Sequence, residues 1–150
     1  MLLLGAGIGV LTRKTVDNSD MQRQIMTWAS NLETVKSVDC PPNVKEKAGD
    51  NYDCKVTFEA GHVATVHVVQ EDNHGKYQMY WSPAIASGPQ AAAMVSASLT
   101  GTWKGAAVDC GKGILDVPDA GLSCSVAQGA AREHVQLLIH DGNVSTRVQP

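Results

Sequence analysis

Aromatic side chains, clustered positive charge and long apolar runs are all scarce in this sequence of 150 residues. It contains three Trp, three Tyr and one Phe, and its formal net charge is -3. The twelve Lys and Arg residues are scattered, with no run longer than Arg13-Lys14. A surface that binds nucleic acid needs clustered basic residues to displace counterions, so we expect no nucleic-acid partner.

Motifs of familiar catalytic chemistry are missing as well. No Gly-x-Ser-x-Gly nucleophile motif occurs. His62 and His67 fall on one predicted strand five positions apart, so they point to opposite faces, and His74, His134 and His140 repeat neither position. No pair has the spacing of metal ligands, so we expect no enzyme, no cofactor and no metal site. If the protein were a hydrolase, it would show a measurable activity that the substitution His67→Ala or His134→Ala abolishes.

The apolar run at residues 1–11 reads MLLLGAGIGVL and is followed by Arg13-Lys14. A helix that crosses the hydrocarbon core of a bilayer needs about 20 residues, and a signal peptide carries its positive charge before the apolar run. Residues 1–15 therefore have the pattern of a signal-peptide remnant or of part of a retained anchor. If the run is retained, we expect membrane contact through residues 1–11.

The sequence does contain one cysteine pattern twice. Val38-Asp39-Cys40 is followed fourteen positions later by Cys54, and Val108-Asp109-Cys110 is followed at the same distance by Cys124. Four cysteines formally allow three connectivities. Because a duplicated module carries its own bridge, we predict Cys40–Cys54 and Cys110–Cys124. Zinc is disfavoured because its structural sites use cysteines two to four residues apart.

These bridges would serve both stability and location. A module of this size buries only about 60% of its unfolded surface, and closing a loop of about 15 residues contributes roughly 3 kcal/mol. Disulfides form in oxidising compartments. We therefore expect an extracytoplasmic protein of the cell envelope, either anchored in the membrane or secreted.

Hydrophobic periodicity predicts a helix and three strands in each copy. A capping-box pattern at residues 19–22 precedes a helix with an apolar stripe from Met21 to Leu32, and residues 87–90 have the same cap form before a second helix that ends near Gly101. Alternating apolar positions fall at 52–58, 64–68 and 77–81, then at 122–126, 135–139 and 144–148. Asp141-Gly142 is the sharpest hairpin signal.

The predicted fold class is α+β, with two repeats, each an N-terminal helix packed on a three-stranded antiparallel β-meander and stapled by one disulfide. We assign residues 16–82 to the first module, 83–89 to a linker and 90–150 to the second module. The two sheets could lie side by side or join at their edges, and the sequence does not decide between these arrangements.

The first copy resembles the small secreted module known as domain of unknown function 4333. The resemblance rests on Val38-Asp39-Cys40-Pro41, Gly49, Tyr52-Asp53-Cys54-Lys55-Val56 and Val66-His67-Val68, and covers about residues 20–81. The second copy departs from the pattern, since Gly111 stands in the place of Pro41. Such modules are common on actinobacterial lipoproteins and single-span envelope proteins. The resemblance implies an exported α+β module whose biochemical role is unassigned.

Four of the aromatic residues indicate where contacts form. Tyr77, Tyr80 and Trp81 crowd the last strand of the first copy, and Trp103 precedes the third cysteine. Alternation places Tyr80 opposite Tyr77 and Trp81, so we expect Tyr80 to be exposed. The cluster could form the interface between the two modules. It could also lie in a protein-binding surface, for which Tyr80, Trp81 and Trp103 are the candidate contacts.

Together these features predict a non-enzymatic exported protein-binding module, an accessory subunit of a membrane complex in the cell envelope. Its expected partner is an envelope or membrane protein. The alternative is a free secreted protein that binds a small ligand or inhibits an extracellular enzyme.

Overall fold

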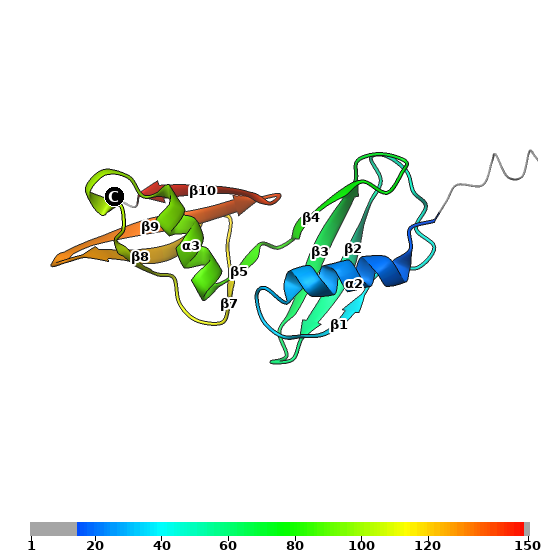
Figure 1. Ribbon diagram of the computed structural model, residues 1–150, viewed down its shortest axis with the longest axis horizontal. Helices are drawn as coiled ribbons and strands as arrows, with labels where there is room; N and C mark the ends of the chain where they lie inside the picture. The colour runs from blue at the N-terminus through cyan, green and yellow to red at the C-terminus, as the bar shows by residue number, and fades with distance from the viewer. Residues whose placement is uncertain (1–14, 149–150) are drawn as a thin grey trace, which may run out of the picture.

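The computed structural model describes residues 15–148, which form two halves joined by a short connection (Figure 1). The predicted anchor or signal remnant lies almost wholly outside the described residues. In the N-terminal half, one helix packs on a four-stranded antiparallel sheet of order β1-β2-β3-β4. Its elements are α2 (Asn18–Ala29), β1 (Val35–Asp39), β2 (Asn51–Phe58), β3 (Val63–Gln70) and β4 (Tyr77–Trp81).

The C-terminal half has a helix, a second four-stranded antiparallel sheet of order β10-β9-β8-β6, and a small sheet of β5 and β7. Its elements are β5 (Ile85–Ser87), α3 (Gly88–Ser98), the 3-10 helix η1 (Gly101–Trp103), β6 (Ala107–Asp109), β7 (Ile114–Asp116), β8 (Leu122–Gln128), β9 (Ala131–His140) and β10 (Asn143–Val148). The α+β class is confirmed, and the two large sheets stay separate. Neither described helix has the length and apolar character needed to cross a bilayer.

All six predicted strands are present, but the prediction of three-stranded sheets is wrong. Each large sheet has an additional edge strand, β1 or β6, that ends directly before a cysteine. Within β1 only Val38 is buried, and β6 has three residues. Neither segment is long or regular enough to show apolar alternation. Pairing with β2 and β8 makes them strands.

The cysteines bond as predicted, in the pairs Cys40–Cys54 and Cys110–Cys124. The register that pairs Val38 with Val56 places the first two cysteines directly opposite each other across β1 and β2. In both bridges the Cα atoms are 4.3 Å apart, close to the roughly 4.5 Å of a cross-strand pair without hydrogen bonds. Each bridge therefore fastens an edge strand to its sheet. The two disulfides indicate an oxidising, extracytoplasmic location.

One of the two predicted helix caps is correct. The Ser87 side chain accepts a hydrogen bond from the Gln90 N–H at 3.2 Å and caps α3. The cap predicted at Ser19 is wrong, because α2 begins earlier and the Asp17 carboxylate accepts from the Asp20 N–H at 3.1 Å. Asp is as good a cap as Ser, so the local pattern did not distinguish the two positions.

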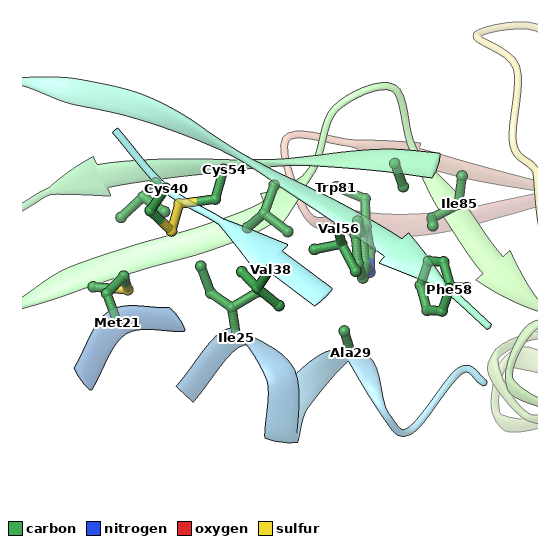
Figure 2. Close-up of a cluster of buried hydrophobic side chains, with 13 residues drawn as sticks. Met21, Ile25, Ala29, Val38, Cys40, Cys54, Val56, Phe58, Trp81 and Ile85 are labelled. Atoms are coloured by element: carbon green, nitrogen blue, oxygen red, sulfur yellow. A yellow bond between two sulfur atoms is a disulfide. The ribbon is translucent and has the colours of Figure 1, made fainter. Parts of the chain in front are cut away.

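The N-terminal core lies between α2 and one face of the first sheet. Figure 2 shows Met21, Ile25 and Ala29 pointing from the helix toward the buried side chains of the strands. Trp81 is 8% exposed and stacks on Trp28, with ring centroids 4.7 Å apart. In the C-terminal half, α3 contributes the smaller side chains of its buried face, Ala91 and Val95.

Residues 83–89, predicted as a linker, are mostly packed. All three residues of β5 are buried, and this strand pairs with β7. Gly88 begins α3 and donates its N–H to the Gly113 carbonyl at 2.9 Å. The connection between the halves is therefore short, and its second part belongs to the C-terminal half.

Candidate functional site

Two depressions lie where the halves meet. One, here called the junction groove, has a volume of about 280 Å³. The other, the polar cleft, has about 300 Å³. Tyr80, Trp81, Ala84 and Ile139 line both, so the depressions adjoin along the end of β4 and the end of β9.

The junction groove is built mainly from apolar side chains of both halves. Its lining includes Trp28 and Met79 from the N-terminal half, and Met94, Ile139 and Val144 from the C-terminal half. Val144 is 46% exposed although it lies on the same face of the second sheet as the buried Leu137. Apolar surface next to the junction is therefore open to solvent.

Tyr80 is half-buried, so the prediction that it is exposed is wrong. The cause is the β9–β10 turn, where Asp141 and Gly142 both have positive φ. A side-chain carbon added at Gly142 would lie 3.2 Å from the Tyr80 Cβ, so the turn passes directly over this residue. Alternation along β4 correctly separates Tyr80 from Trp81, but it contains no information about a turn that lies about 60 residues later in the chain.

The turn also sets the electrostatics of the Tyr80 hydroxyl. Desolvation raises the pKa of Tyr80, and the nearby carboxylate of Asp141 raises it further through its charge and a hydrogen bond. On the other side, the rings of Tyr80 and His67 are 5.3 Å apart, and His67 Nδ1 is 2.6 Å from Asp53 Oδ1. A polar row thus runs across β2, β3 and β4 and reaches the C-terminal half.

The other two candidate contacts have different surroundings. Trp81 lines both depressions but is chiefly a core residue, since it is buried against Trp28 and Phe58. Trp103 lies in η1, half-buried against the C-terminal core, and does not line either depression. The structure therefore brings Tyr80 and Trp81 together at the junction and leaves Trp103 apart.

Several residues of this site were not selected from the sequence. From the sequence, Met94 falls on the second predicted helix, and Met79 and Ile139 fall on predicted strands, without any indication of a shared site. In the polar cleft, Ser82, Asp119 and His140 come together from segments far apart in the sequence. The hairpin signal at Asp141-Gly142 was recognised, but nothing in the sequence indicates that this turn lies against β4.

The side chains at the junction are suited mainly to noncovalent contact with another molecule. Within residues 15–148, no group of three or more His, Cys, Asp or Glu side chains could hold a metal ion. Apolar side chains line the groove, while Tyr80, Gln90 and the polar cleft provide hydrogen-bonding groups at its margin. An apolar centre with a polar rim is the usual composition of a protein contact.

Comparison with known proteins identifies the N-terminal half. A family model described as Domain of unknown function (DUF4333) matches residues 1–75, half of the chain. The matched part contains α2, β1, β2, β3 and the first disulfide. No curated protein and no solved structure matches the chain significantly.

Proposed function

The chain belongs to the DUF4333 family, and we propose that this protein is an exported, non-enzymatic module that binds another protein through the junction groove. The observation that carries the proposal is the groove itself, with apolar side chains from both halves around about 280 Å³ of open space. A partner would insert one large apolar side chain there. Tyr80 and Gln90 would lie at the rim of the contact.

The size of the groove favours a protein partner over a small ligand. Sites for small molecules typically enclose about 300–1,000 Å³ and bury most of the ligand. The groove is at or below the lower limit and is open, which suits a single anchoring side chain. Its Trp, Tyr and Met residues are the types enriched at protein interfaces. Binding of a small ligand, or inhibition of an extracellular enzyme, is the alternative.

We further propose that the protein is an accessory subunit of a membrane complex in the cell envelope, with residues 1–11 as its membrane contact. The two disulfides support the compartment. The apolar sequence of residues 1–11 supports the membrane contact.

The decisive experiment is gentle detergent extraction of native membranes with a tag on the C-terminus. We expect a defined membrane protein to co-purify in stoichiometric amount, and Met94→Lys to abolish its recovery because a charge would enter the groove. Ala93→Lys is the matched control, since Ala93 is the exposed neighbour on the same helix. Equal recovery of the membrane protein with both variants would refute the proposal that the groove is the binding site. Recovery of the protein alone from the soluble fraction would favour the secreted binder.

We also propose that the C-terminal half is a divergent second copy of the family module. In each half a helix precedes a short strand that ends in Val-Asp directly before a cysteine, and a bridge with a sequence separation of 14 joins that cysteine to the neighbouring strand in the sheet. A crystal structure tests this by superposition of the halves. Coinciding helices, strands and bridges are expected, whereas a different strand order in the C-terminal half would contradict the proposal.

A further inference from the structure

The outer side of β10 is a free strand edge. Among residues 15–148, β10 pairs only with β9 and ends the second sheet (Figure 1). Asn143 faces His140 across the two-residue turn, so Asn143, Ser145 and Arg147 exchange backbone hydrogen bonds with β9. Val144, Thr146 and Val148 therefore direct their N–H and C=O groups away from the sheet.

The other described edges have features that oppose pairing with another chain. β1 is interrupted by a register shift between Val35 and Ser37 and carries Lys36. β4 ends inside the junction, where Trp81 is buried. β5, β6 and β7 have three residues each. Bulges, lysines and shortness are common protections of edge strands, and β10 has none of them.

The side chains of β10 also favour pairing. Val144 and Val148 are 46% and 62% exposed, and they lie on one face with Thr146 between them. The one charged side chain of the strand, Arg147, lies on the other face. Its Nε donates to Gln136 Oε1 on β9 at 3.2 Å, which directs the guanidinium toward the sheet rather than toward the free edge.

We propose that β10 pairs antiparallel with β10 of a second copy of this chain, about a two-fold axis at Thr146. In this register Val144 lies opposite the partner's Val148, and Thr146 opposite the partner's Thr146. All three residues present outward-directed backbone groups, so the pairs are hydrogen-bonded ones. The second sheet of one copy and the second sheet of the other, each with four strands, would then form one continuous sheet.

The composition of the strand favours a copy of itself as the occupant. Cross-strand pairs of β-branched residues and Thr–Thr pairs are favourable, and like charges directly opposite are not. In the proposed register Arg147 faces the partner's Ser145, so no like charges lie directly opposite each other. A register centred on Ser145 would instead leave Val148 without an apolar partner. The register at Thr146 covers both exposed valines on both copies.

The oligomeric state of the full chain tests this surface. Val144 lines the junction groove as well, so the test substitutes Thr146, which does not line that groove. We expect concentration-dependent dimers of the wild-type chain in sedimentation velocity. Thr146→Lys and Thr146→Glu should each weaken dimerisation several-fold, because like charges would face each other. An equimolar mixture of the two variants should restore dimers. Val63→Lys is the control, since Val63 is 50% exposed on β3 of the other sheet.

A second measurement does not depend on charge. Thr146→Cys should give a covalent dimer on non-reducing gels, because paired Cα atoms about 5.5 Å apart are within disulfide range. Ser145→Cys should give none, because in this register Ser145 lies opposite the partner's Arg147 and not opposite the partner's Ser145. A wild-type chain that stays monomeric at millimolar concentration would overturn the proposal. So would a charged-variant mixture that stays monomeric, or equal cross-linking at both positions.

Discussion

The substitution Trp81→Ala tests whether Trp81 is a core residue or a contact residue. The side chain is 8% exposed, and its ring stacks on Trp28 at 4.7 Å and lies 6.0 Å from Phe58. A buried aromatic side chain removes about 150–250 Å² from water, which at about 25 cal/mol per Å² corresponds to roughly 4–6 kcal/mol. Because part of the chain collapses into the cavity, we expect Trp81→Ala to lower the free energy of unfolding by about 3–5 kcal/mol.

The assay is urea unfolding followed by far-UV circular dichroism and by the fluorescence of the remaining tryptophans. Trp28 reports on the N-terminal half and Trp103 on the C-terminal half. Tyr80→Ala is the control, because Tyr80 is half-buried at the junction, and we expect it to cost about 1–2 kcal/mol at most. A cost for Trp81→Ala below about 1 kcal/mol would refute the assignment of Trp81 to the core.

Changes at three further sites have expected outcomes. The Tyr52 hydroxyl is buried without a hydrogen-bond partner among the described residues, so Tyr52→Phe should keep or raise stability in urea unfolding. Burial raises the pKa of Tyr52 from 10.0 to about 12, so the unfolded state loses this proton first. Wild-type stability should therefore fall as the pH rises between those values, and more steeply than that of Tyr52→Phe. A Cβ at Gly88 would lie 2.0 Å from the Gly111 carbonyl oxygen, so Gly88→Ala should cost about 1–3 kcal/mol and increase hydrogen exchange in α3. Replacing Cys110 and Cys124 together by Ala should lower the free energy of unfolding by roughly 3 kcal/mol and therefore lower the thermal midpoint. An unchanged midpoint would contradict the predicted role of the bridge.

Local patterns were sufficient for most elements of this fold. Buried positions alternate along β2 and β3, and β9 has two such positions, Val135 and Leu137, so a period of two is visible in these strands without any tertiary information. Asp141-Gly142 marks a two-residue turn because that turn requires positive φ at both positions, and both residues adopt it. The cysteine pairing was predictable because the same spacing occurs twice.

Elements whose identity depends on a distant partner were not predictable. β1 and β6 have too few buried residues to show a period, and only their pairing with β2 and β8 makes them strands. The same holds for β5, which forms a strand because it pairs with β7 inside a segment that reads as a linker.

The sequence by itself determined the α+β class, the positions of the helices and long strands, the disulfide pairing and the compartment that follows from it. These properties depend on residue spacing and on backbone preferences over a few positions. Only the tertiary structure decided that the β9–β10 turn covers Tyr80, that Trp81 belongs to the core, and that Met79, Met94 and Ile139 meet at one groove. Such contacts join residues about 60 positions apart, and they depend on how two separate cores pack, which periodicity along one chain does not encode.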